Sequence, residues 1–113
     1  MLLAACGGTA VPPPTPTLSA QAQQGKAIFS RDCGSCHSTA EDTIIVGPSL
    51  AGVAGRAATR VPGQDATTYL LTSIMRPDSY LVAGFEDLMP QNFAKDLTGE
   101  ELDAVVAYLL TLE

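Results

Sequence analysis

The chain has 113 residues, which is the length of one domain and too short for two well-packed ones. Hydrophobic residues make up 46% and charged residues 16%, proportions that exclude a disordered chain. Six Lys and Arg against twelve Asp and Glu give a net charge of -6, the wrong sign for binding a nucleic-acid backbone. We therefore expect one folded domain that binds no nucleic acid.

The N-terminal segment ends in a cysteine. Leu3-Ala4-Ala5-Cys6, followed by two glycines, is similar to a bacterial lipoprotein signal, in which the cysteine becomes the N-terminus and carries lipid on its sulfur. A complete secretory signal has a positive region and about 7–15 apolar residues, so this one is truncated or its start is misassigned. Residues 1–6 are thus predicted to be a signal remnant with a lipidated Cys6. The alternative is an unmodified thiol on a disordered tail.

Residues 7–19 are predicted to be a flexible linker. Four of the eight prolines fall here, among Gly, Thr, Ala and Ser and without a charged residue. A proline-rich linker extends by about 3.1 Å per residue, so this one would reach on the order of 40 Å. The folded domain is then expected over residues 20–113.

A first helix is predicted over Ala20–Asp32. Ser19 is a favourable N-cap residue, and Ile28 and Phe29 lie near one face together with Gly25. A glycine inside a helix costs about 1 kcal/mol relative to alanine, so Gly25 either weakens the helix or marks a close approach by another element.

The motif Cys33-Gly34-Ser35-Cys36-His37 follows this helix, and C-x-x-C-H is the pattern of c-type heme attachment. Its two thiols can reach two vinyl groups of one porphyrin, while His37 is carried beneath the iron. A redox-active dithiol would also use C-x-x-C, but it is expected beside a βαβ pattern, which is not visible. A zinc site needs four ligands, and only Cys6 remains as a fourth Cys or His. The motif therefore favours heme c.

A second helix is predicted over Ala66–Met75, preceded by loops rich in glycine and proline. Leu70, Leu71, Ile74 and Met75 form its apolar stripe, and Pro77 ends it. No period-two alternation that would predict a sheet is found in the chain.

A second iron ligand can be sought by elimination. His37 is the only histidine, so two histidines cannot ligate one iron within this chain. A thioether is a usual partner of histidine in cytochromes, and Met1 lies outside the predicted domain. Met75, on a helix stripe where methionine is usually core, Met89, in a loop before Pro90, and an open position remain.

The last helix has the strongest local signals. Thr98 and Glu101 form a capping box, with Leu97 and Leu102 at the hydrophobic-staple positions. An apolar face continues from there, and the helix is predicted to run to Leu112.

Four features in this order resemble the monoheme class I c-type cytochromes over residues 20–113. They are the C-x-x-C-H motif, Gly47-Pro48-Ser49-Leu50, Met89-Pro90, and a final helix with Ala107-Tyr108-Leu109. The resemblance implies an all-α fold of about four to five helices wrapped around one covalently attached heme. It also implies that the first and last helices cross, with Gly25 against Tyr108.

The resemblance also assigns the site. Cys33 and Cys36 would bind the heme covalently, and the iron ligands would be His37 and Met89. The carbonyl of Pro48 would accept a hydrogen bond from the other ring nitrogen of His37, as groups beside a metal ligand generally do. Leu50 would pack on the heme, and Arg56 would approach a heme propionate.

With both axial positions filled, the iron has no vacant site, so we expect a one-electron carrier and no enzyme. Residues 69–74 and 83–90 are similar to cytochrome domains of membrane complexes, namely the monoheme subunit of alternative complex III and the domain fused to subunit II of heme-copper oxidases. The alternative is a peroxidase-like heme enzyme or sensor with an open sixth position.

This resemblance implies a cellular location and electron-transfer partners for the protein. We expect a lipid-anchored subunit of a respiratory or photosynthetic complex on the outer, periplasmic face of the bacterial cytoplasmic membrane. Its donor would be a multiheme cytochrome or an iron–sulfur protein, and its acceptor an oxidase or a soluble carrier.

Overall fold

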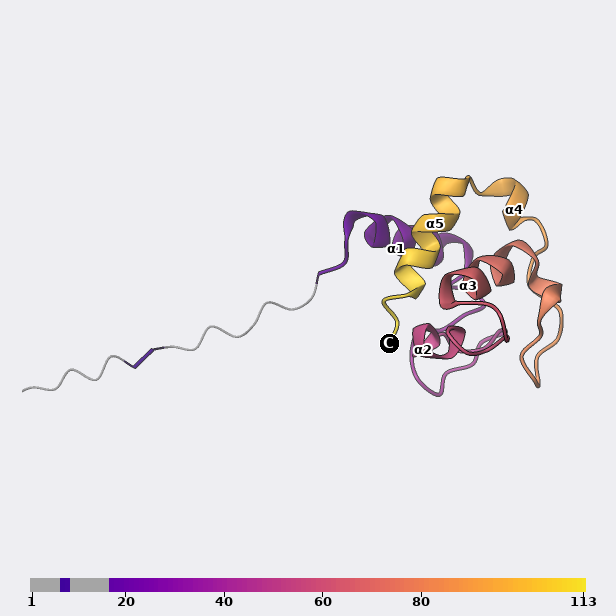
Figure 1. The fold of residues 1–113 in the computed structure, drawn as a ribbon, viewed down its shortest axis with the longest axis horizontal. Coiled ribbons are helices and arrows are strands. Elements are labelled where there is room, and N and C mark those ends of the chain that lie inside the picture. The colour runs from indigo at the N-terminus through magenta and orange to yellow at the C-terminus, as the bar shows by residue number, and fades with distance from the viewer. Residues whose placement is uncertain (1–6, 9–16) are drawn as a thin grey trace, which may run out of the picture.

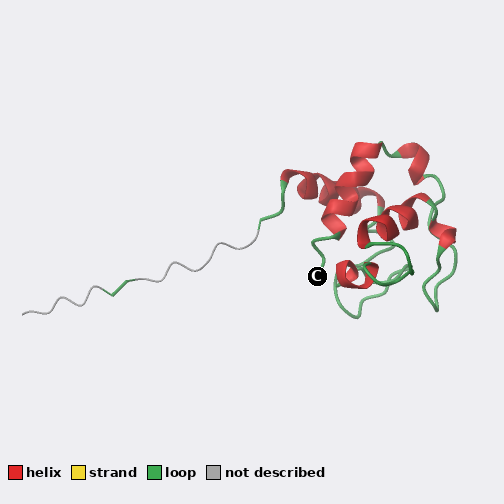
Figure 2. Cartoon of the chain, viewed as in Figure 1, coloured by secondary structure: helices red, strands yellow, loops and turns green. Residues whose placement is uncertain are grey.

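The structure is a computed structural model that describes residues 7–8 and 17–113 (Figure 1). The described residues form five α-helices, one 3-10 turn and no strand. Figure 2 shows how loops connect the helices. The elements are α1 (Ala20–Asp32), α2 (Val53–Ala57), α3 (Ala66–Met75), η1 (Pro77–Ser79), α4 (Phe93–Asp96) and α5 (Gly99–Leu109). The predicted all-helical class is confirmed. Cys6 and most of the predicted linker lie outside the described residues.

Helices α1 and α3 have the predicted bounds, and a side chain caps the first turn of each. The Ser19 hydroxyl accepts a hydrogen bond from the Ala22 amide at 3.1 Å. The Asp65 carboxylate accepts one from the Thr68 amide at 2.8 Å, a cap that the sequence pattern had not indicated. None of the helices in residues 17–113 has both the length and the apolar character needed to cross a membrane.

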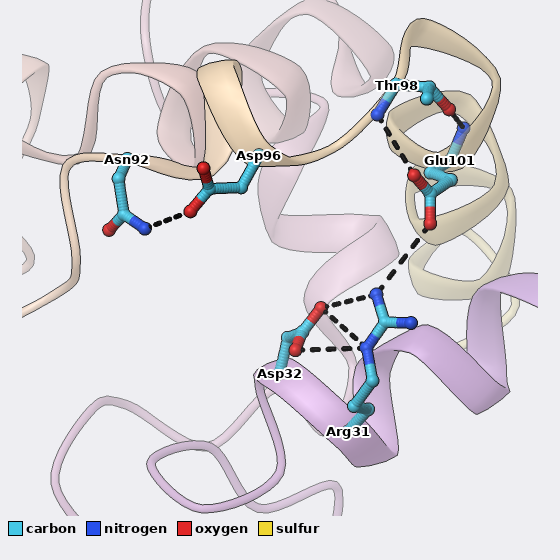
Figure 3. A network of polar contacts seen from close by, with 6 residues as sticks. All are labelled: Arg31, Asp32, Asn92, Asp96, Thr98 and Glu101. Carbon is cyan, nitrogen blue, oxygen red and sulfur yellow. Dashed lines mark hydrogen bonds and ion pairs between the residues drawn. The ribbon is translucent and has the colours of Figure 1, made fainter.

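The capping box of α5 is confirmed (Figure 3), but the predicted end of this helix is wrong. The Thr98 hydroxyl accepts from the Glu101 amide, and the Glu101 carboxylate accepts from the Thr98 amide, both at 3.1 Å. The helix ends at Leu109, three residues before Leu112. The chain then turns more tightly, and the Leu112 carbonyl accepts a hydrogen bond from the Ala54 amide at 3.1 Å. A contact with α2 thus takes the place of a further helical turn.

Helices α1 and α5 cross in close contact, as predicted (Figure 1). A Cβ atom at Gly25 would lie 1.9 Å from the Ala104 carbonyl oxygen and 2.9 Å from Tyr108 Cβ. Beside this point the rings of Phe29 and Tyr108 pack with centroids 5.5 Å apart. Only glycine allows this approach.

One charged side chain spans the same pair of helices. Arg31 on α1 lies 2.8 Å from the carboxylate of Asp32 and 3.7 Å from that of Glu101 on α5 (Figure 3). The Arg31 side chain is 59% exposed, so this pair of contacts adds little to stability.

The hydrophobic core takes its buried residues mainly from α1, α2, α3 and α5, and residues of the loops that follow α1 and α3 pack against it. On α3 the buried residues are Tyr69, Leu70 and Ile74. Met75 is 39% exposed, so the expectation that it fills the core is wrong. Helix α3 presents Tyr69 to the core, so the buried face is rotated relative to the predicted stripe.

Candidate functional site

A cavity lined mainly by apolar side chains lies between the core helices and the two long loops. It contains about 1240 Å³ of space free of protein atoms, counting its open mouth. The predicted site residues that line it are Cys33, Cys36, His37, Pro48, Leu50 and Met89. Tertiary structure therefore brings together residues that are up to 56 positions apart in the chain, counted from Cys33 to Met89.

The end of α1 places His37. The amides of Cys36 and His37 both donate to the Cys33 carbonyl, at 3.1 and 3.0 Å, so the motif continues the helix as a tight turn. His37 Nδ1 donates to the Pro48 carbonyl oxygen at 2.8 Å, as expected from the resemblance. Because a carbonyl can only accept, Nδ1 carries the proton, and in the neutral ring Nε2 then has the lone pair that can bind a metal.

Gly47 allows the histidine ring to occupy this position. A Cβ atom at Gly47 would lie 2.6 Å from His37 Cε1 and 3.0 Å from Nδ1, closer than real side chains approach. The amide of Gly47 also donates to the Cys36 carbonyl at 2.8 Å. From the sequence, Gly47 is only the first residue of the Gly47-Pro48-Ser49-Leu50 feature, with no role of its own.

Arg56 lies on α2 and does not line this cavity. Its guanidinium donates to the carbonyl oxygens of Ser49, at 3.0 Å, and of Ala51. Arg56 thereby holds residues 49–51, which follow Pro48, against α2. Arg56 and Arg60 line a second, adjoining hollow. The contact of Arg56 with a heme propionate stays a prediction.

The two methionines that the structure describes have different surroundings. Met89 lines the cavity and packs against the core, whereas Met75 is 39% exposed and is not part of the lining. The Met89 loop is closed by a hydrogen bond from Gln91 Nε2 to Asp87 Oδ1 at 3.2 Å. Of these two, Met89 is therefore the thioether that can act inside the cavity.

Burial raises the pKa of the Cys33 thiol to about 11, with a smaller contribution from the negative charge of Asp32. The thiol is therefore protonated at neutral pH. Redox-active dithiols have the opposite property, because the thiolate is their nucleophile and its formation is favoured by a lowered pKa. This argues against the thiol oxidoreductase considered from the sequence.

The donor set and the lining fit heme c. Two cysteines, a histidine with one free ring nitrogen and a methionine sulfur face a cavity that a flat apolar group can enter. These are the attachment groups and the axial ligands used by c-type cytochromes.

Comparisons with known proteins agree with this geometry. The family model described as Cytochrome c matches residues 22–113. Among solved structures, an engineered cytochrome c from Rhodothermus marinus bound to a carbene intermediate, 1-ethoxy-1-oxopropan-2-ylidene, is similar with a TM-score of 0.51. It is 21% identical, and the match covers 88% of this chain and 89% of that one. A search of curated proteins found no match.

Proposed function

Because this chain belongs to the cytochrome c family and its cofactor is a covalently bound heme c, we propose that it is a membrane-tethered carrier of single electrons. The observation that carries the proposal is the histidine geometry. His37 Nδ1 is engaged by the Pro48 carbonyl at 2.8 Å, so Nε2 is available for iron, and Met89 lines the same cavity. Two protein ligands leave no coordination position for a substrate.

Different residues of the site have different roles. Cys33 and Cys36 would hold the heme through thioethers, and His37 and Met89 would ligate its iron. Bound heme c supplies reversible one-electron chemistry. The Pro48 carbonyl keeps the proton on Nδ1 and raises the basicity of Nε2, while the apolar lining around Leu50 keeps water away from the ligands.

The tether and the complex are supported by sequence features alone. The Leu3-Ala4-Ala5-Cys6 pattern supports a lipid anchor at Cys6, and residues 7–19 would then let the domain move near the membrane. We propose the outer, periplasmic face of a bacterial cytoplasmic membrane as its place. Alternative complex III, or another quinol-oxidising complex, is the proposed assembly, and it would provide both the donor and the acceptor.

Visible spectra of the full chain, produced in a heme-attaching host, test the carrier. We expect low-spin c-type bands and the weak far-red band of methionine-ligated ferric iron. Met89→Ala should abolish the far-red band, whereas the matched variant Met75→Ala should keep it. A high-spin spectrum of the unchanged protein, with binding of added ligands at neutral pH, would instead establish an enzyme or sensor with an open position.

Membrane fractionation and mass determination test the anchor. With an intact signal sequence supplied, the protein should co-sediment with membranes and carry the mass of attached lipid, and Cys6→Ser should lose both. A wild-type protein that carries no lipid would contradict the tether and leave the carrier unaffected.

A further inference from the structure

Large apolar side chains are exposed in the two loops that border the cavity. Ile44 is 65% exposed, Ile45 52%, Val46 47% and Leu88 63%. Val46 and Leu88 belong to the lining of the cavity, but Ile44 and Ile45 do not. A heme that fills the cavity therefore leaves the two isoleucines in contact with solvent. We call these four residues the apolar rim.

The apolar rim lies beside both segments that hold the proposed iron ligands. The amide of Val46 donates to the Cys36 carbonyl at 3.2 Å, which places this loop against the attachment motif. Leu88 directly precedes Met89. Exposed apolar groups beside a functional cavity are typical of interaction sites.

The charges that the two loops themselves contribute have one sign, although Arg60, outside these loops, lies 5.9 Å from the centroid of the Tyr80 ring. Residues 38–50 and 80–92 contain four carboxylates and no Lys or Arg. The carboxylates are exposed, and none of them forms an ion pair in the part of the chain that the structure describes; they are Glu41, Asp42, Glu86 and Asp87. Arg56 and Arg60 share the second hollow with Glu41 and Asp42, where Arg56 donates to backbone carbonyls. The two loops thus carry -4 of the net charge of -6.

We propose that the apolar rim and these carboxylates form the docking surface for a redox protein whose contact face has an apolar centre bordered by Lys and Arg. The proposal rests on the proposed carrier function and specifies its partner. Apolar contact at the centre would exclude water beside the cavity, and opposite charges at the edge would orient the partner during approach. An acidic partner would be repelled by the same carboxylates.

Small redox reagents can measure this surface before a partner is known. Tris(1,10-phenanthroline)cobalt(III) is a cation with an apolar surface, and each cobalt takes one electron from the ferrous protein. Ferricyanide takes one electron in the same way but is an anion. Hexaammineruthenium(II) is a polar cation that gives one electron to the ferric protein. Stopped-flow rate constants are measured for the holoprotein at several ionic strengths.

Pairs of variants then separate the effect of charge on these rate constants from the effect of apolar contact. Removing one carboxylate from each loop with Glu41→Gln and Glu86→Gln should slow both cations about threefold or more at low ionic strength and speed ferricyanide. The matched control removes two exposed charges of α5, Glu100→Gln with Asp103→Asn, and should change these rates less than twofold.

The isoleucines are tested with the cobalt complex. Ile44→Ser with Ile45→Ser should slow electron transfer to the cobalt complex about fourfold. The rate with hexaammineruthenium should not change, because only the cobalt complex buries apolar surface on contact. Met75→Ser, at an exposed methionine outside the cavity, is the control.

Three results would overturn the docking surface. One is ferricyanide accelerating as ionic strength falls, and another is an isoleucine variant that behaves like Met75→Ser. The third is sedimentation showing a wild-type dimer that Ile44→Ser with Ile45→Ser converts to monomer, which would make the apolar rim a contact between copies. Low-spin spectra retained by all variants would show that the carrier site is intact, so such a failure would concern docking alone.

Discussion

Gly25→Ala measures how closely α1 and α5 must approach. The added Cβ would lie 1.9 Å from the carbonyl oxygen and 2.5 Å from the carbonyl carbon of Ala104. Both are backbone atoms that cannot rotate away, so the two helices must separate. Overpacking of a core costs about 1–3 kcal/mol. Alanine in place of glycine within a helix returns about 1 kcal/mol. Because backbone atoms must be displaced, we expect a packing cost near the upper end of that range. After the gain from alanine is subtracted, the free energy of unfolding should fall by about 2 kcal/mol.

For a domain of this size, 1 kcal/mol corresponds to a change in Tm of about 4–8 °C. Gly25→Ala should therefore lower the Tm of the holoprotein by about 8–16 °C, and Gly25→Leu by more. Thermal unfolding followed by circular dichroism measures this. Gly55→Ala in α2 is the matched control, since a Cβ there meets no atom within 4 Å and its Tm should stay or rise. A Gly25→Ala protein as stable as Gly55→Ala would refute the close crossing.

Three further predictions concern the histidine and the cap of α5. Gly47→Ala should displace the His37 ring, because the new Cβ would lie 2.6 Å from Cε1, and should weaken the low-spin spectrum; an unchanged spectrum would contradict this contact. Thr98→Ala should cost about 1 kcal/mol in the free energy of unfolding, measured with urea, and no loss would contradict the cap. The hydrogen bond from the Thr98 amide lowers the pKa of Glu101, so its stabilisation exists above the unfolded pKa and is lost as pH falls through the folded value. The stability difference between wild type and Glu101→Gln should therefore shrink below about pH 4, and a difference independent of pH would exclude this linkage.

Local sequence determined the starts of the main helices and the cofactor. Ser19 caps α1 and Thr98 with Glu101 caps α5, because these bonds close within one turn and need no distant partner. The C-x-x-C-H motif acts within five residues in the same way. Such short-range signals can be read from neighbouring residues alone.

Tertiary contacts decided the rest. The end of α5 depends on a hydrogen bond with Ala54, and the exposure of Met75 depends on which face of α3 meets the core. Arg56 binds backbone carbonyls because α2 lies beside the Pro48 segment, and Gly47 is required because the His37 ring packs against it. The first two outcomes depend on segments far apart in the chain, whereas the contacts of Arg56 and Gly47 depend on how a loop folds back on residues five to ten positions away. In each case packing and tertiary hydrogen bonds, and not the residue types alone, select among the local possibilities.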